Sequence, residues 1–408
     1  MKKIKIGKPY IENSHNDKVR LCSNIERNGD ESVLYYEVER EYRQFLNDDR
    51  CDAFVVGLIN SCMFDGSDIV CDGVVTEQLL FQLNMYYIPL ISDLFSDMNP
   101  IHILAKTTNE SVKNQGAIGT GNSGGVDSTY TMLKYSKDEL KSFKLTHVLF
   151  TNISTNDDDE DRIRRLFERD LPLKVEAAHY MGLIPISVYT NLYSFYKQPG
   201  IFNHYFAQQY CSAPLALGKL FKAYYFSSTF KANDFSMDEN FIVSSGRYDI
   251  FSLKTLTTSN LAFYSAGTEV DRMDKLEYIV DSDYSKKYLQ VCAVEQSAGG
   301  KNKAAKLNCG YCNKCGRMIG LFYAQGKLED YKNIFDLSFF YENKAKFIAK
   351  NVEADQGAFS KEVVKMLKKN HKYPVGTSFY RPYYHIRYKL AKNDKLVKFY
   401  HKIRGIED

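Results

Sequence analysis

A glycine-rich loop constrains the fold of this chain most. It reads Gly121-Asn122-Ser123-Gly124-Gly125-Val126-Asp127-Ser128 and lies between two apolar segments. Residues 117–120 are expected to form a short strand before the loop, and residues 127–136 to begin a helix after it. A strand that turns directly into a helix is typical of proteins in which helices connect parallel strands. The loop therefore predicts an α/β fold.

The residues after this loop continue the alternation of strands and helices. Further strands are expected over residues 145–153, 184–190, 223–228 and 241–244, and helices over residues 158–182, broken near Pro172, and 206–222. This rhythm predicts a doubly wound parallel sheet with helices on both faces.

We expect four parts along the chain. Residues 1–114 should form an N-terminal α/β domain, residues 115–290 the sheet domain, residues 291–345 a cysteine-rich segment and residues 346–408 a basic helical tail. Within the first part, strands are expected over 32–38, 52–59 and 100–106 and a helix within 75–95. The polar stretch 107–116 reads as the first boundary.

The loop has the chemistry of a phosphate site. Backbone amides at the start of a helix have no partner within the helix, and the helix dipole favours an anion there. Two glycines allow close approach of the main chain, and the hydroxyls of Ser123 and Ser128 can donate to phosphate oxygens. Asp127 can hold a magnesium ion that bridges the phosphates.

Two other phosphate motifs fit the loop less well. A Walker A loop needs a Lys before the Ser or Thr, where this chain has Asp127. The run 119–124 matches the dinucleotide pattern G-x-G-x-x-G, but the following strand, 145–153, lacks the acid that would bind a ribose. A glycine-rich turn that merely caps a helix is the remaining alternative.

The run Ser123-Gly124-Gly125-Val126-Asp127-Ser128 resembles the SGGxDS signature of the PP-loop ATP pyrophosphatases. The resemblance implies an enzyme that binds ATP with magnesium, adenylates its substrate and releases pyrophosphate. It implies that Asn122 through Ser128 bind the nucleotide, with Asp127 and Ser128 in catalysis. The other site residues that it implies are Phe150, Thr151 and Asn152 at the adenine, Ser245 and Gly246 on the opposite side of the nucleotide, and Arg272 and Lys275 at the departing pyrophosphate. The last two can equally form ordinary salt bridges with acids on a helix surface.

Four of the nine cysteines have the spacing of metal ligands. Cys309, Cys312 and Cys315 follow C-x2-C-x2-C, and Cys292 lies upstream. Four thiolates predict a closed tetrahedral zinc site with a structural role. An iron–sulfur cluster is the alternative, because ferredoxin-like runs use the same spacing.

The run 309–322 resembles the zinc segment of the 7-cyano-7-deazaguanine synthases, which are themselves PP-loop enzymes, and Arg317 matches their Arg after the last Cys. The resemblance implies a PP-loop/HUP-like α/β fold with a four-cysteine zinc knuckle and an N-terminal α/β extension. That family is about half as long, and its substrate stretch has no match in the sequence at 246–255. The substrate is therefore expected to differ.

Composition and charge limit the class of protein further. Hydrophobic residues make up 44% and charged residues 25%, as in soluble globular proteins, and no apolar run is long enough to span a bilayer. Residues 361–408 hold thirteen Lys or Arg and four Asp or Glu. This basic tail could contact nucleic acid, or it could be a solvated helical surface. We expect a cytoplasmic protein without a membrane span.

The leading functional expectation is an AMP-forming ligase that adenylates a small carboxylate for amide or nitrile formation. Residue 2 is Lys, so no N-terminal Cys glutaminase is expected, and the nitrogen should come from ammonia, an amine or a separate donor protein. Two alternatives stay open: adenylation of a tRNA base for thiolation or ligation, and an ATP sensor without turnover.

Overall fold

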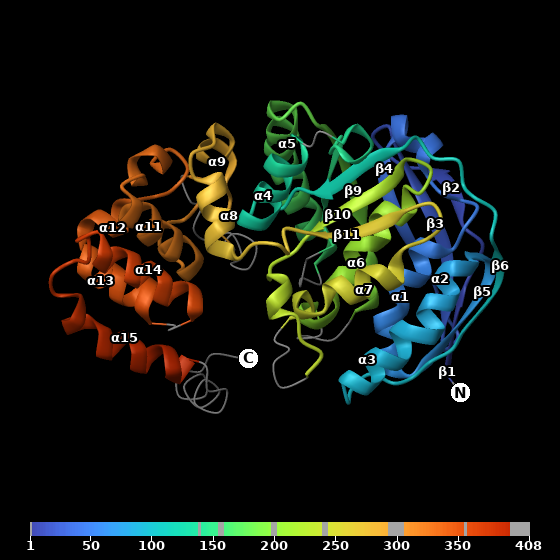
Figure 1. The fold of residues 1–408 in the computed structure, drawn as a ribbon. Coiled ribbons are helices and arrows are strands. Elements are labelled where there is room, and N and C mark those ends of the chain that lie inside the picture. The colour runs from blue at the N-terminus through green and yellow to red at the C-terminus, as the bar shows by residue number, and fades with distance from the viewer. Residues whose placement is uncertain are drawn as a thin grey trace. The chain divides into compact units, whose positions relative to one another are not determined.

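A computed structural model describes residues 2–137, 140–153, 159–196, 202–238, 244–292, 306–354 and 357–391. By its internal contacts the chain divides into two compact units: Met1–Ser123 with Asp127–Ile279, and Gly124–Val126 with Val280–Asp408 (Figure 1). Residues 241–243 of the expected strand 241–244 and the tail beyond 391 lie outside the described residues. The predicted boundaries at 114, 290 and 345 stay predictions.

The described residues of the first unit contain one mixed sheet of eleven strands, in the order β11-β10-β7-β8-β9-β4-β3-β1-β5-β6, with β2 beside β3. The strands are β1 (Lys2–Ile6), β2 (Tyr10–Asn13), β3 (Lys18–Arg27), β4 (Asp30–Glu39), β5 (Ser67–Thr76), β6 (Ile103–Thr108), β7 (Ala117–Gly121), β8 (His147–Thr151), β9 (Ile184–Thr190), β10 (Phe221–Ser227) and β11 (Ala262–Ala266).

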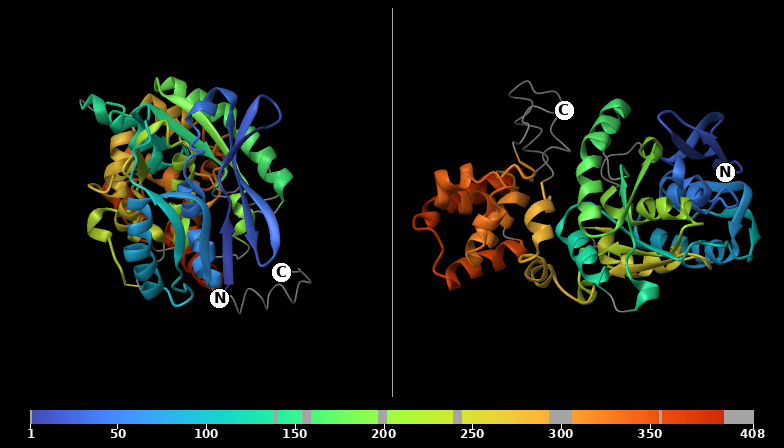
Figure 2. Two further views of the ribbon diagram at one scale, coloured as in Figure 1. Left: turned by 90° about the vertical axis from the view of Figure 1, so that its right-hand side faces the viewer. Right: turned by 90° about the horizontal axis from the view of Figure 1, so that it is seen from above.

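The expected parallel sheet is present as the five strands β7 to β11, which pair in parallel throughout. The N-terminal strands, blue in Figure 2, continue the same sheet. They join it through an antiparallel pair between β4 and β9, where Tyr36 lies opposite Thr190. Strands from both sides of residue 114 therefore belong to one sheet.

Helices cover both faces of this sheet. They are α1 (Asp52–Asp65), α2 (Glu77–Gln82), α3 (Ile88–Leu94), α4 (Val126–Tyr135), α5 (Glu160–Tyr180), α6 (Phe202–Ala216), α7 (Asp249–Leu256) and α8 (Arg272–Ile279), with a π turn, Leu83–Tyr87, between α2 and α3. On one face, α5 packs Ile163 and Phe167 against Tyr189. On the other, α1 and α6 pack together in the main core.

The strand predicted over residues 52–59 is wrong, because these residues form the first half of α1. Every residue from Asp52 to Met63 is buried, so the segment has no polar side to reveal a helical period. An apolar run buried on all sides cannot be assigned as strand or helix from its pattern alone. The helix ends at Gly66, whose φ of 70° makes a left-handed cap.

The predicted break near Pro172 is also wrong, since α5 runs from Glu160 to Tyr180 with this proline inside it. A proline leaves the carbonyl four residues earlier, here that of Glu168, without its usual helical partner. Glu168 and Pro172 are both exposed, so water can satisfy this carbonyl and the helix can continue. The expected helix 206–222 ends earlier than predicted, at Ala216.

The glycine-rich loop follows β7, and at β7 the strand order reverses. The chain moves from β7 to β8 and β9 on one side, then returns to β10 and β11 on the other. The carboxyl ends of these parallel strands meet at one edge of the sheet. Open α/β sheets bind ligands at this reversal point, outside the carboxyl ends of the strands.

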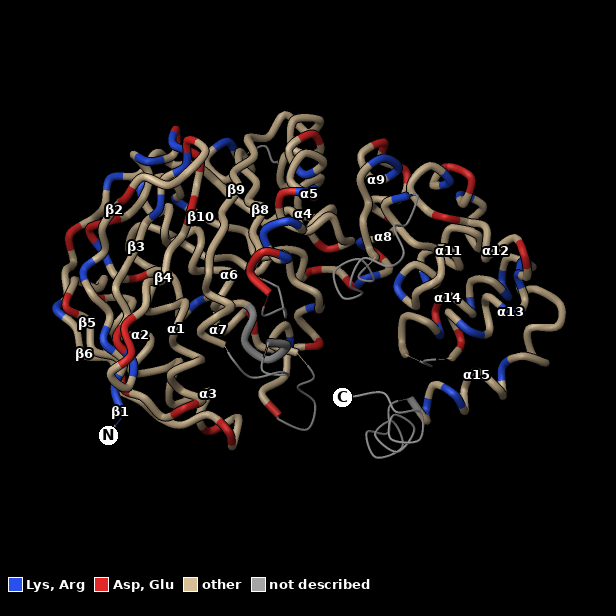
Figure 3. Tube along the Cα trace, turned by 180° about the vertical axis from the view of Figure 1, so that it is seen from behind, with Lys and Arg blue, Asp and Glu red and all other residues tan. Residues whose placement is uncertain are grey.

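The second unit is helical in its described residues. Its helices are α9 (Asp283–Tyr288), α11 (Asn313–Gln325), α12 (Ser338–Glu342), α13 (Lys344–Ile348), α14 (Ala358–Lys369) and α15 (Thr377–Ala391). Its core includes Phe322 and Tyr331, whose rings stack 3.8 Å apart. Helix α15 carries Lys and Arg and no Asp or Glu (Figure 3). Throughout the described part of the chain, no helix has the length and apolarity needed to cross a bilayer.

Candidate functional site

The loop after β7 is tied to the sheet at Asn122. The Asn122 amide donates to the Leu149 carbonyl over 2.8 Å, and its buried side chain donates through Nδ2 to the Lys174 carbonyl over 3.2 Å. The Asn122 Oδ1 atom is buried and has no hydrogen-bond partner among the described residues. Asn122 is therefore held in place, and its Oδ1 is a buried acceptor without a partner in the described part of the chain.

The two predicted hydroxyl donors meet, because Ser123 Oγ and Ser128 Oγ lie 2.9 Å apart. Between them Gly124 has a φ of 78°, which an L side chain rarely adopts. Val126 then begins α4, a helix of ten residues. A glycine turn that leads directly into the start of a helix, with a hydroxyl on each side of the turn, is expected of a phosphate loop.

Two predicted catalytic residues, Arg272 and Lys275, both contact the carboxylate of a third, Asp127. The Arg272 guanidinium lies 2.8 Å from one oxygen of Asp127, and the Lys275 ammonium lies 3.5 Å from the other. These residues are distant in sequence, since Asp127 lies in the first turn of α4 and the two cations lie in α8. Two cations around one carboxylate leave a local excess of positive charge beside the loop.

The two cations differ in exposure. Lys275 is 1% exposed and donates to the Ser228 carbonyl over 2.6 Å, whereas the Arg272 side chain is 42% exposed. Burial lowers the pKa of Lys275, and the nearby Asp127 carboxylate opposes this effect. Lys275 is thus held rigidly, while Arg272 can reorient toward a bound anion. The alternative, an ordinary salt bridge on a helix surface, does not fit Lys275, because this side chain is buried.

The residues predicted near the adenine lie at the end of β8, where they contact β9 and α5. Both amide atoms of Asn152 bond to the main chain of Thr190, at 2.8 and 2.9 Å. Phe150 stacks on Phe167 of α5 with ring centroids 4.8 Å apart, and Thr151 is partly exposed at the end of β8. Contact of these residues with an adenine stays a prediction.

Ser245 and Gly246 lie in a short turn, Ser245–Arg247, before α7. The Ser245 hydroxyl is buried without a hydrogen-bond partner in the described part of the chain. Gly246 packs closely under Phe230, since a Cβ atom there would lie 2.9 Å from the ring. Their contact with a nucleotide likewise stays a prediction.

Two buried ionisable residues near this edge were not predicted. Asp249 is 1% exposed, accepts from the Ser265 hydroxyl over 3.0 Å, and has a pKa raised by burial to about 7. Lys174 lies on the buried side of α5 and reaches the loop. A Lys that continues the apolar stripe of Ile163 and Phe167 was the available sequence signal for it.

The four predicted metal ligands come together in the second unit. The sulfur atoms of Cys292, Cys309, Cys312 and Cys315 all lie within 4.8 Å of one another. Cys309 Sγ and Cys315 Sγ are 3.8 Å apart, the separation of about 3.8 Å that four sulfurs would have around one tetrahedral ion bound at about 2.3 Å. The sulfur positions therefore fit a single metal ion.

Asn308 joins the distant Cys292 to the other three cysteines. Its Oδ1 accepts from the amides of Val291 and Cys292, at 2.8 and 3.2 Å, and its Nδ2 donates to the Leu289 carbonyl over 2.8 Å. Residues 293–305, which connect the two parts, lie outside the described residues. Asn308 therefore explains how a ligand sixteen residues away reaches the cluster.

Glycine is required at position 310 of the knuckle. Gly310 has a φ of 75°, and a Cβ atom there would lie 1.7 Å from the Asp336 carbonyl oxygen. The neighbouring Cys312 caps α11, because its sulfur accepts from the Cys315 amide. A left-handed turn at Gly310 thus separates Cys309 from Cys312.

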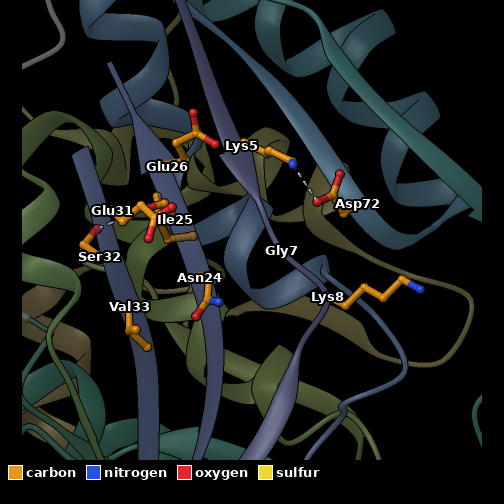
Figure 4. A pocket seen from close by; sticks show the side chains of 10 residues that line it. All are labelled: Lys5, Gly7, Lys8, Asn24, Ile25, Glu26, Glu31, Ser32, Val33 and Asp72. Carbon is orange, nitrogen blue, oxygen red and sulfur yellow. Dashed lines mark hydrogen bonds and ion pairs between the residues drawn. The ribbon is translucent and has the colours of Figure 1, made fainter. Parts of the chain in front are cut away.

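A pocket of about 490 Å³ lies elsewhere, on the solvent side of β1, β3, β4 and β5 (Figure 4). Its lining mixes Lys5 and Lys8 with Glu26, Glu31 and Asp72, and Lys5 pairs with Asp72 over 3.1 Å. Because three acids outnumber two lysines there, the pocket offers no selective site for an anion.

Comparisons with protein-family models, with curated proteins and with solved structures found no match. The loop, the charged cluster beside it and the cysteine site are the features of this chain that bear on its function.

Proposed function

We propose that this chain is an ATP pyrophosphatase of the PP-loop type, which forms AMP and pyrophosphate while adenylating a small carboxylate. The observation that carries the proposal is the convergence of Asp127, Arg272 and Lys275 beside a glycine loop at the reversal point of a parallel sheet. The strand order β9-β8-β7-β10-β11 supports it, because nucleotide-binding sheets use this order.

The proposed first step is attack of a substrate carboxylate oxygen on the α-phosphorus of ATP. A new oxygen–phosphorus bond forms, the bond to the bridging oxygen of the β-phosphate breaks, and the pyrophosphate leaves with the electron pair. Arg272 and Lys275 would neutralise the charge that develops on this leaving group. Electrostatic stabilisation by preorganised groups is usually the largest single contribution to catalysis. In the second step a nitrogen nucleophile attacks the acyl carbon, and AMP leaves.

Asp127 would hold the magnesium ion that accompanies ATP. One carboxylate is enough, because magnesium is usually bound by one or two carboxylates together with the substrate's phosphates. The ion would supply positive charge to the phosphate oxygens. Without a nucleotide, Asp127 is instead balanced by Arg272 and Lys275.

We propose that the metal of the cysteine site is zinc, with a structural role. In an iron–sulfur cluster the thiolates bind different iron atoms, so some sulfurs lie farther apart than around one ion. All four sulfurs of this site lie within 4.8 Å, which supports a single ion. A four-thiolate site leaves no open position for catalysis.

Product analysis with a matched pair of variants tests the proposal. The purified protein would be given ATP, magnesium, ammonium and a panel of carboxylates, and AMP and pyrophosphate would be measured. Arg272→Met should lower turnover on the order of a hundredfold, as expected for loss of one charge-stabilising group. The control Arg169→Met removes an arginine of similar exposure, 43%, also paired with an aspartate, and should leave turnover unchanged.

Three results would contradict the proposal. ADP and phosphate as products would indicate phosphoryl transfer to water or another acceptor. ATP binding without any turnover would favour the sensor alternative. Equal activity of Arg272→Met and Arg169→Met would remove the charged cluster from the mechanism.

A further inference from the structure

Lys174 makes two contacts with two consecutive residues of the loop. Its Nζ donates to the Ser123 carbonyl over 2.9 Å, and its own carbonyl accepts from Asn122 Nδ2 over 3.2 Å. Lys174 is 5% exposed, although it belongs to a helix with many charged and exposed residues. A lysine is seldom buried to this extent without a specific interaction.

The contact with Ser123 fixes the orientation of a peptide plane. In a planar trans peptide the carbonyl and the following N–H point in opposite directions. With the Ser123 carbonyl held by Lys174, the Gly124 amide must therefore point away from α5. The Gly124 carbonyl is held in turn by the Gln290 amide over 2.8 Å, which fixes the next plane as well.

We propose that Lys174 is a positioning residue that presets the loop amides for the pyrophosphate part of ATP. This inference rests on the proposed function of the loop. Preset donors need no rearrangement when the anion arrives, so they bind it more tightly than donors that must first be ordered. Lys174 acts through the Ser123 peptide rather than by touching the reacting atoms.

Contacts with the sheet hold helix α5 in place, and they thereby fix the position of the Lys174 backbone. Near the start of the helix, Arg164 pairs with the buried Glu37 of β4 over 3.0 Å, and its guanidinium lies over the ring of Tyr189. One turn further on, Phe167 stacks on Phe150 of β8. The N-terminal strands thereby contribute to the site by holding the helix that holds the loop.

The burial of Lys174 has an energetic cost, which supports a specific role. Desolvation lowers its pKa to about 8, and the charge of Asp170 on the same helix opposes this shift. An apolar residue would fill the same place against Phe150 without that cost. The ammonium is therefore best explained by the carbonyl that it holds.

Calorimetric titration with magnesium pyrophosphate, and separately with ATP, tests the inference on the full chain. Lys174→Met keeps most of the volume and removes the donor, and it should raise Kd about tenfold or more, as expected for loss of a hydrogen bond from a charged donor. Lys174→Arg keeps a cation with N–H donors and should bind nearly as well as the unsubstituted protein. Lys222→Met, at an exposed lysine of β10, is the control and should not change Kd.

Each outcome has one meaning. A folded Lys174→Met variant that binds pyrophosphate with unchanged Kd would overturn the inference, and so would a folded Lys174→Arg variant as weak as Lys174→Met. If Lys174→Met does not fold, as shown by its melting temperature, the Lys174→Arg variant decides alone: retained binding supports the inference and lost binding overturns it. If the unsubstituted protein binds neither ligand, the proposed function fails, because this result does not depend on Lys174.

Discussion

Replacing Gly310 by Ala should disrupt the cysteine site by a clash with the main chain. The added Cβ would lie 1.7 Å from the carbonyl oxygen of Asp336 and 2.8 Å from its carbon. Ordinary carbon–oxygen contacts are about 3.3–3.6 Å, so the two backbone segments must separate by more than about 1.5 Å. A left-handed φ adds roughly 1–2 kcal/mol for any L residue, and overpacking adds roughly 1–3 kcal/mol.

The expected loss of stability is therefore about 2–5 kcal/mol. The chain offers a control variant that separates the backbone strain from the steric clash. Gly182 also has a positive φ, 68°, but nothing lies within 4 Å of an added Cβ. Gly182→Ala should cost only the backbone strain, roughly 1–2 kcal/mol. Urea titrations of both variants, with metal release followed by a colour indicator, measure the difference. Equal stability losses, or full metal retention in Gly310→Ala, would refute the reasoning.

Three further predictions concern one metal-site cysteine and two buried carboxyl groups. Cys312→Ser should lower both metal content and melting temperature, because metal binding contributes to folding, and elemental analysis with calorimetry checks this. Burial acts to raise the pKa of Glu37, but hydrogen bonds from Ser14, Arg164 and Arg20 outweigh it and lower the pKa. Glu37→Gln should therefore lose roughly 2–3 kcal/mol in urea titrations at pH 7. This difference should shrink as the pH falls from the usual pKa of a glutamate through the lowered pKa of Glu37 in the folded state. Asp249 has its pKa raised to about 7 by burial, so the folded state keeps a proton that the unfolded state releases. Stability relative to Asp249→Asn should therefore fall by up to roughly 4 kcal/mol as the pH rises from about 4 to 7, and an unchanged difference in denaturation across that range would contradict this.

The features that could be predicted from the sequence are those encoded over a few consecutive residues. The turn at Gly124 and the start of α4 depend on local chemistry, and both were predicted from the residues of the loop. The cysteine cluster was predicted in the same way, because three ligands lie within seven residues. Its fourth ligand, Cys292, depends on Asn308, a contact that spacing alone does not reveal.

The features that could not be predicted depend on contacts between distant segments. The antiparallel pairing of β4 with β9 joins residues about 150 apart and merges the N-terminal strands with the parallel sheet. The helix α1 was mistaken for a strand because the surrounding elements bury it on every side. Lys174 and Asp249 are isolated charged residues in sequence, and only the fold shows that they lie buried near the carboxyl ends of the strands.

The position at which ATP is cleaved distinguishes a pyrophosphatase from a kinase or an ATPase. Phosphorus NMR of a reaction with ATP, magnesium, ammonium and an accepted carboxylate distinguishes the two modes of cleavage in one spectrum. The loop 121–128 has no lysine at the Walker A position, and Arg272 and Lys275 lie beside Asp127, where we propose that they neutralise a leaving pyrophosphate. We expect AMP and pyrophosphate in equal amounts, formed only when the carboxylate is present. ADP and inorganic phosphate as the products would contradict it.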